Sequence, residues 1–306
     1  MKHSLLLQDK VIVITGAGRG IGRASAIMAA AHGAKVVVND LGGAEDGSGN
    51  SQSPADEVVS EIIAAGGEAV SSYASVTSWD EAHEIIAAAI DNFGRIDAVV
   101  NNAGNLRDAI FHKMTEADFD AVINVHLKGT FNVSRAAAPH FRAQTNGSFV
   151  NMTSTSGLIG NYGQANYAAA KLGIVGLSKS MALDMGRFRV RSNCIAPFAW
   201  SRLIGTIPTN TDEEKARVEK IQQMTPEKIA PLVVSLCSDA SKHISGQIFG
   251  VRKNEIFLFN QNRPIRSAHN SEGWTPHSVL ERAMPAFEAD FFELQRSGDI
   301  FTWDPI

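Results

Sequence analysis

The sequence predicts an α/β fold in which a parallel sheet of seven strands carries helices on both faces, followed by a C-terminal extension. Short runs rich in β-branched residues alternate with longer helical patterns over residues 1–250. These runs are almost continuously apolar, which is typical of strands buried on both faces of a sheet. Glycines follow three helical patterns, at Gly33, Gly66 and Gly94, where a left-handed residue commonly ends a helix.

Seven strands and six helices are expected in chain order. The predicted strands are Val11–Ile14, Lys35–Val38, Ala69–Tyr73, Ala98–Val100, Ser148–Met152, Val190–Ile195 and Gln247–Phe249. The predicted helices are Ile21–Ala31, Pro54–Ala65, Asp80–Phe93, Glu116–Arg142, Ala165–Gly186 and Pro226–Asp239. Ser53 and Thr115 precede two of these helices and are expected to cap them. This alternation favours a doubly wound sheet.

Composition and charge exclude several classes of protein. The 306 residues include 44% hydrophobic and 20% charged residues, an ordinary globular mixture. The net charge of −4 argues against a nucleic-acid partner, because such domains are normally basic. The apolar run Leu5-Leu6-Leu7 is too short for a signal peptide or a membrane span, so we expect no membrane partner.

Cysteine usage points to a reducing compartment. Cys194 and Cys237 are the two cysteines of the chain, and two lone thiols do not make a disulfide framework. A cytoplasmic location is therefore expected. No cluster of Cys and His has metal-ligand spacing, so we expect no metal site.

A glycine-rich turn follows the first predicted strand and opens the first predicted helix. It consists of Thr15, Gly16, Ala17, Gly18, Arg19, Gly20, Ile21 and Gly22. Glycines allow the backbone to come close to a pyrophosphate, and the helix start supplies aligned N–H donors. Alone, the motif could be a turn without a ligand. Its strand–turn–helix context favours a Rossmann-type dinucleotide site.

The choice between NAD and NADP is expected to depend on Asp40, which ends the second predicted strand 18 residues after Gly22. An acidic residue at about this distance hydrogen-bonds the ribose 2′-hydroxyl of NAD, and its charge would repel a 2′-phosphate. We therefore expect NAD. Two alternatives stay open: Asp40 could only cap the loop that follows it, and Arg19 could pair with a phosphate.

Three polar residues form the predicted catalytic group. Tyr167 and Lys171 stand four residues apart on a predicted helix, so their side chains share one face. Ser154 follows the strand that ends at Met152, at the edge of the sheet where ligands bind in open α/β folds. Tyr167 would transfer a proton, with its pKa lowered by the neighbouring ammonium, and Ser154 would hold the substrate oxygen.

Together these motifs resemble the short-chain dehydrogenase/reductase family over about residues 8–250. The resembling segments are the glycine turn Thr15–Gly22, Asn101-Asn102-Ala103-Gly104, Ser154 and Tyr167-Ala168-Ala169-Ala170-Lys171. The resemblance implies roles for further residues: Asn102, Ala103 and Gly104 line the cofactor, Asn124 completes a catalytic tetrad through a water, Ser75 and Val76 flank the adenine, and Pro197 begins a loop over the nicotinamide. Beside this tetrad, His126 is interpreted as a packed or solvated histidine rather than an acid.

The substrate class is inferred from a narrower resemblance. Val38–Gly43, Asn101–Asp108, Gly160–Tyr167 and Ala230–Val233 are similar to the (3R)-hydroxyacyl-CoA dehydrogenase domains of peroxisomal multifunctional enzymes type 2, the 17-beta-hydroxysteroid dehydrogenases type 4. This implies NAD-dependent oxidation of a CoA thioester or a steroid-type alcohol. The expected substrate wall consists of Ser154, Asn161, Tyr162, Gln164, Phe198 and Trp200. An NADPH-dependent 3-oxoacyl-carrier-protein reductase and a catalytically silent cofactor-sensing scaffold are the alternatives.

The chain is expected to divide into a dinucleotide-binding and catalytic domain, residues 1–250, and an aromatic-rich extension, residues 251–306. In the extension, Leu280, Met284, Phe287 and Phe291 make one apolar helical stripe, interrupted by Pro285. We expect it either to pack over the substrate side of its own or a partner subunit, or only to reinforce the fold or the oligomer. The resemblance also implies a homodimer or homotetramer built on the fifth and fourth predicted helices. The candidate contact residues there are Val133, Ala137, Leu172, Val175 and Ser178.

Overall fold

One sheet of eight strands organises the computed structural model, which describes residues 5–43, 49, 53–199 and 211–306. The strands are β1 Val11–Thr15, β2 Lys35–Asn39, β3 Glu68–Ser72, β4 Ala98–Asn101, β5 Gly147–Met152, β6 Val190–Phe198, β7 Ile248–Arg252 and β8 Glu255–Leu258. Their order in the sheet is β3-β2-β1-β4-β5-β6-β7-β8. Neighbours from β3 to β7 pair in parallel, which confirms the seven-stranded parallel sheet.

The eighth strand lies in the predicted extension, which was not expected to contribute to the sheet. β8 pairs with β7 in antiparallel register, with Gly250 opposite Phe257. A tight hairpin of this kind needs no crossover helix, so it escapes the alternation on which the sequence prediction depended. The extension therefore begins by adding an edge strand to the sheet.

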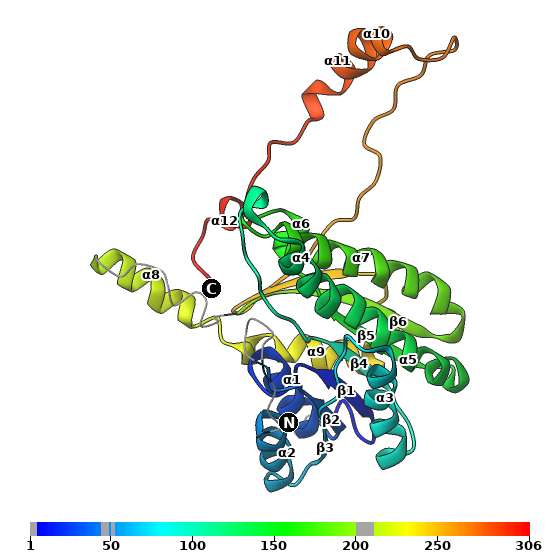
Figure 1. The fold of residues 1–306 in the computed structure, drawn as a ribbon, viewed down its shortest axis with the longest axis vertical. Helices are drawn as coiled ribbons and strands as arrows, with labels where there is room; N and C mark the ends of the chain where they lie inside the picture. The colour runs from blue at the N-terminus through cyan, green and yellow to red at the C-terminus, as the bar shows by residue number, and fades with distance from the viewer. Residues whose placement is uncertain (1–4, 44–48, 50–52, 200–210) are drawn as a thin grey trace.

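Helices cover both faces of the sheet (Figure 1). They are α1 Gly20–Ala31, α2 Ser53–Ala64, α3 Trp79–Phe93, α4 Glu116–Ile123, α5 Gly129–Gln144, α6 Thr155–Leu158, α7 Ala165–Met185, α8 Asp212–Gln222, α9 Ala230–Cys237, α10 Pro276–Ser278, α11 Met284–Phe287 and α12 Ser297–Ile300. Alternate residues of β1 face opposite cores. Ile12 and Ile14 pack with α1, α2 and α9, whereas Val11 and Val13 pack with α3 and α5. This is the two-sided burial that the apolar runs predicted.

Of the two predicted N-caps, Thr115 is found, whereas Ser53 is itself the first residue of α2 and its hydroxyl donates to Glu57 Oε1 at 2.8 Å. Thr115 accepts the backbone N–H of Asp118 at 3.1 Å and so caps α4. Gly33, Gly66 and Gly94 all have positive φ, between 76° and 91°. The predicted long helix Glu116–Arg142 is instead divided: α4 is followed by a single π turn, Asn124–Lys128, and then by α5. Turns of this kind are rare and are often found at functional sites.

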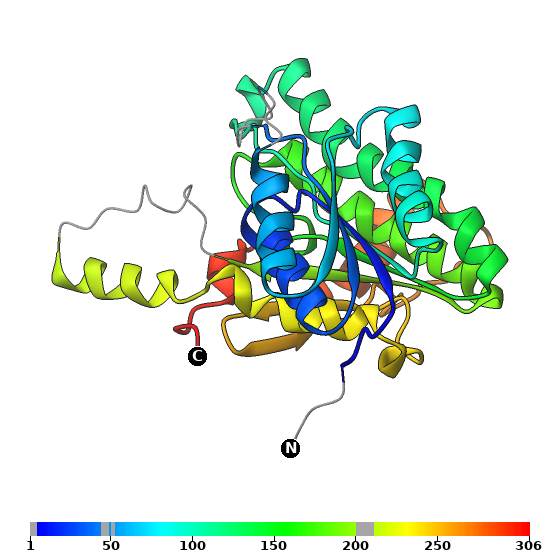
Figure 2. The same ribbon diagram turned by 90° about the horizontal axis from the view of Figure 1, so that it is seen from below.

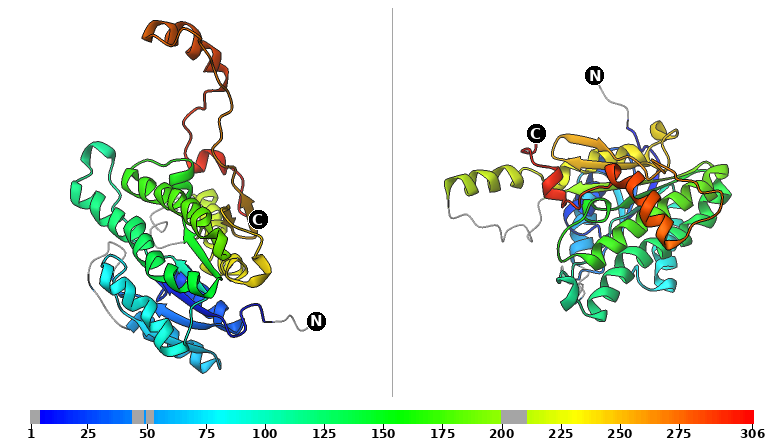
Figure 3. Two further views of the ribbon diagram at one scale, coloured as in Figure 1. Left: turned by 90° about the vertical axis from the view of Figure 1, so that its right-hand side faces the viewer. Right: turned by 90° about the horizontal axis from the view of Figure 1, so that it is seen from above.

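The extension leaves the body and returns to it. Between β8 and α12 the chain runs outward to α10 and α11, which stand away from the sheet in Figure 1 and in the left panel of Figure 3. Thr275 caps this helical arm, because its hydroxyl accepts the N–H of Ser278 at 3.1 Å. A π turn, Val279–Ala283, precedes Pro285 in α11, which agrees with the expected interruption because proline disturbs the preceding turn. Leu280 and Phe291 are 67% and 61% exposed, so this stripe is not packed on its own subunit.

The end of the extension packs against the sheet. The ring of Phe301 lies edge-on to Phe198 of β6, at 4.8 Å between centroids, and to Phe257 of β8, at 5.3 Å. The indole of Trp303 donates to the Glu255 carboxylate at 2.8 Å. The last residues thus join β6 and β8.

The segment between β6 and Pro226 contains none of the helices predicted from the sequence. It contains helix α8, which extends from the body in the view from below (Figure 2). Its sequence is strongly polar, DEEKARVEKIQ, so the sheet-facing apolar pattern of the other helices gives no signal for it. Among the described residues, no helix is long and apolar enough to cross a membrane.

Candidate active site

The glycine turn between β1 and α1 forms a backbone cradle. Gly16 and Gly20 have φ of 62° and 53°, a conformation that side chains rarely adopt. A Cβ on Gly18 would lie 2.8 Å from the Asp40 carboxylate. Among the described residues no side chain caps the start of α1, and its first turn has no acidic residue. The first N–H groups of this 12-residue helix can therefore bind a phosphate, so the turn fits a dinucleotide.

Asp40 and Arg19 each bond backbone groups close to this turn. Asp40 Oδ2 accepts the N–H of Gly18 at 2.7 Å, and Oδ1 accepts the N–H of Gly42 at 2.7 Å. The loop-capping alternative is thus partly realised, but each carboxylate oxygen can accept a second bond. Arg19 Nη1 donates to the Gly43 carbonyl at 3.2 Å. The carboxylate and the guanidinium both flank the end of β2.

The end of β4 is fastened to the glycine turn. Thr15 Oγ1 accepts the N–H groups of Asn102 and Ala103 at 3.0 and 3.1 Å. Asn102 Nδ2 donates to the carbonyls of Thr15 and Gly16. Beyond β3, the amide of Ser75 donates to Glu81 at 2.7 Å, and Val76 is almost fully buried. These contacts fix the backbone on both sides of the predicted cofactor cleft.

Ser154, Tyr167 and Lys171 converge at the carboxyl edge of β5. Ser154 begins α6 directly after this strand, and its Oγ accepts the N–H of Ser156 at 3.1 Å. Tyr167 and Lys171 lie on α7, with the ammonium 5.4 Å from the centre of the phenol ring. Lys171 is buried, and its Nζ donates to the Met152 carbonyl at 2.7 Å.

Burial dominates the protonation of these groups. It raises the pKa of Tyr167 to about 12, although the Ser154 hydroxyl acts in the opposite direction. Burial lowers the pKa of Lys171 to about 7. The direction for Tyr167 is opposite to the sequence expectation. The reason is that the phenol itself is buried, and the lost solvation of its charged form raises the pKa more than the Ser154 hydroxyl lowers it.

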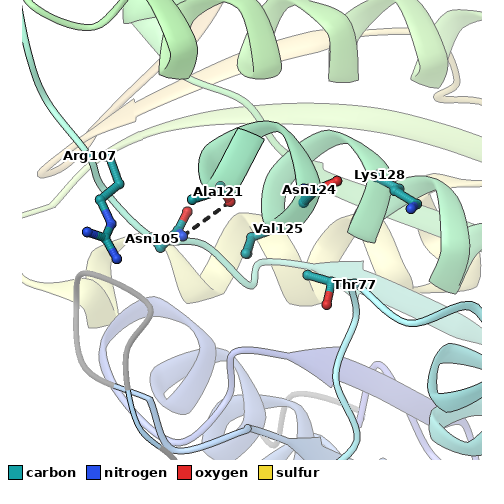
Figure 4. Close-up of a pocket in the computed structure, with 7 residues that line it drawn as sticks. All are labelled: Thr77, Asn105, Arg107, Ala121, Asn124, Val125 and Lys128. Carbon is teal, nitrogen blue, oxygen red and sulfur yellow. Dashed lines mark hydrogen bonds between the residues drawn. The ribbon is translucent and has the colours of Figure 1, made fainter. Parts of the chain in front are cut away.

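Asn124 begins the π turn between α4 and α5 and lines a cavity of about 340 Å³ (Figure 4). The same cavity is lined by Thr77, Asn105, Arg107, Ala121, Val125 and Lys128. Asn105 Nδ2 donates to the Ala121 carbonyl at 3.3 Å across its wall. The predicted proton relay through Asn124 stays a prediction.

Part of the expected substrate wall is joined by hydrogen bonds. Asn161 Nδ2 donates to Ser156 Oγ at 2.9 Å, and Ser156 Oγ donates to Gln164 Oε1 at 2.8 Å. Gln164 Nε2 donates to Asp108 Oδ2 at 2.8 Å. Ser156 and Asp108 were not among the predicted site residues, although both take part in this series of hydrogen bonds. They lie within or beside the predicted motifs, but loop hydrogen bonds have no spacing that predicts them.

The remaining predicted site residues are distributed differently from the expectation. Tyr162 is 77% exposed, with the Arg296 guanidinium 5.4 Å above its ring. Pro197 does not begin a loop: it lies inside β6, opposite Val251, because β6 continues to Phe198. Trp200 lies outside the described residues. Among the described residues, no group of three His, Cys, Asp or Glu side chains could hold a metal.

Comparisons with known proteins agree with this geometry. Residues 10–206 match the family model described as short chain dehydrogenase. The chain belongs to this family. It is 50% identical over 261 residues to a short-chain type dehydrogenase/reductase of Mycobacterium tuberculosis, covering 84% of this chain and 87% of that one. A crystal structure of a short chain dehydrogenase from Mycobacterium avium superposes with a TM-score of 0.82 at 37% identity, covering 95% of this chain and 98% of that one.

Two further relatives have more specific names. The chain is 43% identical over 283 residues to mouse peroxisomal multifunctional enzyme type 2, covering 92% of this chain but 37% of that enzyme. It is 38% identical over 251 residues to a 3-oxoacyl-(acyl-carrier-protein) reductase of Thermotoga maritima, covering 80% of this chain and 97% of the reductase. The protein is thus an NAD(P)-dependent short-chain dehydrogenase/reductase acting on small molecules, which confirms the predicted family and enzyme class.

Proposed function

We propose that this short-chain dehydrogenase oxidises the secondary alcohol of a 3-hydroxyacyl-CoA or steroid-type substrate with NAD. The observation that carries the reaction is the convergence of Ser154, Tyr167 and Lys171 beside the glycine turn. The similarity to peroxisomal multifunctional enzyme type 2 over most of this chain supports the substrate class.

The proposed chemistry divides between the residues. Ser154 Oγ holds the substrate oxygen, and Tyr167 Oη takes the hydroxyl proton as the carbonyl forms. Bound NAD⁺ supplies the acceptor for the hydride from the carbinol carbon and a positive charge that favours the phenolate. The Lys171 ammonium lies 5.4 Å from the centre of the phenol ring, beside the group that exchanges the proton. Burial raises the pKa of Tyr167, so oxidation should accelerate with rising pH as the phenol ionises.

The preference for NAD is proposed from Asp40. Its carboxylate lies against the turn at Gly18, where a ribose hydroxyl could donate to a free lone pair and a 2′-phosphate would be repelled. Arg19 supports the alternative of a reductase that uses NADPH, and the Thermotoga relative favours that alternative as well. A cytoplasmic setting is proposed from the free thiols Cys194 and Cys237.

A homodimer or homotetramer is also proposed. The large side chains of Leu172 and Leu183 on α7 are 49% and 83% exposed, and Phe131 on α5 is 44% exposed. These residues, rather than Val133, Ala137, Val175 and Ser178, which are all buried in the subunit's own core, would form a contact through the helices. Light scattering at micromolar protein that found only monomer would exclude it.

Replacement of Tyr167 by phenylalanine tests the proposed chemistry. Tyr167→Phe should leave the Kd for NAD⁺ within about twofold and lower kcat by roughly 10²–10⁴-fold, the usual contribution of general acid–base assistance. The assay is initial-rate formation of NADH from (3R)-3-hydroxybutyryl-CoA. Tyr73→Phe, which removes a phenol hydroxyl that donates to Asp56 outside the site, is the matched control for a lost phenol. Retention of more than about a tenth of the wild-type kcat would remove Tyr167 from the proton transfer.

A further inference from the structure

His126 is a buried histidine that the proposed chemistry does not use. It lies in the π turn between α4 and α5 and is 4% exposed. Its imidazole stands edge-on to the phenol ring of Tyr167, with the ring planes at 87° and their centroids 5.2 Å apart. The histidine therefore contacts the residue that is proposed to move the proton.

The same ring holds the end of the cofactor-lining segment after β4. His126 Nε2 lies 2.8 Å from the Asn105 carbonyl and 3.1 Å from the Asn105 amide nitrogen. The Asn105 N–H donates to Nε2 when this nitrogen carries no proton, and Nε2 donates to the Asn105 carbonyl in the other tautomer. Burial and the nearby charge of Lys171 lower the pKa of His126 to about 3, so the ring is neutral at physiological pH.

Gly104 has no room for a side chain on this side. A Cβ there would overlap with Cε1 of the imidazole and would lie 3.1 Å from both ring nitrogens. Such a Cβ would point toward His126. The glycine thus allows the ring to pack directly on the backbone that leads to Asn105.

We propose that His126 is a positioning residue that fixes Tyr167 relative to the cofactor-lining turn at Gly104 and Asn105. The ring edge limits the rotation of the phenol, and the bond to Asn105 fixes the turn against which the cofactor is expected to lie. The π turn makes this possible because it displaces the helix at His126. The proposal deepens the proposed function and rests on Tyr167 as its acid/base.

Three variants separate the two contacts. His126→Ala removes both of them. His126→Gln retains an amide at about the place of Nε2, and so retains the bond to Asn105 while the ring edge is lost. His126→Phe retains the edge and loses the bond. Phe141→Leu is the matched control, because Phe141 is a buried aromatic residue of α5 that contacts another ring, Phe149 at 5.0 Å, outside the site.

The measured quantities are kcat, KM and the Kd for NAD⁺ with (3R)-3-hydroxybutyryl-CoA, together with Tm. His126→Ala should lower kcat by roughly 10- to 100-fold, the size expected when a catalytic group is misplaced by about 1 Å, with KM within about threefold. His126→Gln and His126→Phe should each recover part of this loss. Phe141→Leu should lower Tm without changing kcat.

A double variant tests the contact at Gly104. Gly104→Ala should lower kcat because the added methyl displaces the imidazole, and His126→Ala should make room for it. The loss in the double variant should therefore be smaller than the product of the two single losses. The positioning role would be overturned if the loss in the double variant equalled the product of the two single losses. A wild-type kcat in His126→Ala would also overturn it. Tyr167→Phe measured in the same assay separates the failures: if it keeps its activity, the proposed function fails, whatever the histidine variants show.

Discussion

Burial of the cationic Lys171 lowers the free energy of unfolding of the protein. This residue is 4% exposed, and its ammonium donates to the Met152 carbonyl. In the unfolded chain it stays protonated up to its ordinary pKa of 10.5, but in the fold only up to about 7. Between these values the unfolded chain binds more protons, so the free energy of unfolding rises with pH across this window.

Replacement of this lysine should therefore stabilise the fold while it removes activity. Lys171→Met should raise Tm most at pH 7 and below, and the difference should decrease toward pH 10.5, since burial then no longer opposes a charge. Thermal unfolding without cofactor at several pH values measures it. Lys179→Met on the same helix is the control and should show no such trend. A lower Tm for Lys171→Met at every pH would contradict the assignment.

The candidate catalytic residues could be found from the sequence because their placement follows from local spacing. Tyr167 and Lys171 share a helix face four residues apart, and Ser154 follows a strand end, so any parallel sheet brings them together. Asp108 and Ser156 could not be found in this way. Their roles depend on loop hydrogen bonds to Gln164, which no periodicity encodes.

At the scale of elements, the end of β2 determines the proposed cofactor choice. Asp40→Asn keeps the size of the side chain and an oxygen for Gly18 or Gly42, but removes the charge. Because a hydrogen bond to a charged group contributes about 1.5–3 kcal/mol, the ratio of NADP⁺ to NAD⁺ affinity should rise roughly 10- to 100-fold. Fluorescence titration of both cofactors measures it. Arg19→Gln should lower NADP⁺ affinity alone, and an unchanged ratio in Asp40→Asn would show that Asp40 does not select the cofactor.

Strands and most helices were predictable because burial on both faces leaves continuous apolar runs. The π turn was not, since Glu116–Arg142 has one uninterrupted helical pattern and the widened turn at Asn124–Lys128 comes from tertiary packing. β8 was also missed. It has four residues. Its apolar side chains Ile256 and Leu258 are 62% and 67% exposed, so they do not lie on a buried face of the sheet.

For the whole molecule, the helical arm of the extension is the feature that a single subunit does not explain. After the arm, the chain returns to the body beside the substrate wall, where the N–H of Ser297 donates to the Gly160 carbonyl at 3.0 Å. Leu280 and Phe291 of the arm are exposed, although the sequence predicts them to be buried. We propose that these side chains pack on a partner subunit of the proposed oligomer.

Charges on the arm test whether it closes a partner's substrate site. Leu280→Glu combined with Phe291→Glu should raise KM for a long-chain 3-hydroxyacyl-CoA by about tenfold or more, since burying one large apolar side chain contributes about 1.5–3 kcal/mol. KM for the short-chain substrate should stay the same. Glu281→Gln, an exposed neighbour, is the control. Unchanged KM for every substrate with only a lower Tm would make the arm a structural brace.

The most direct test of the central proposal is a single panel of initial rates for the wild-type protein. Each of NAD⁺ and NADP⁺ is combined with short- and long-chain (3R)- and (3S)-3-hydroxyacyl-CoA, a hydroxysteroid and a simple secondary alcohol, and reduced cofactor is followed by absorbance. We expect the highest kcat/KM for a (3R)-3-hydroxyacyl-CoA with NAD⁺, and rates that rise with pH. A higher kcat/KM with NADP⁺, or turnover of simple alcohols but of no thioester or steroid, would contradict the proposal.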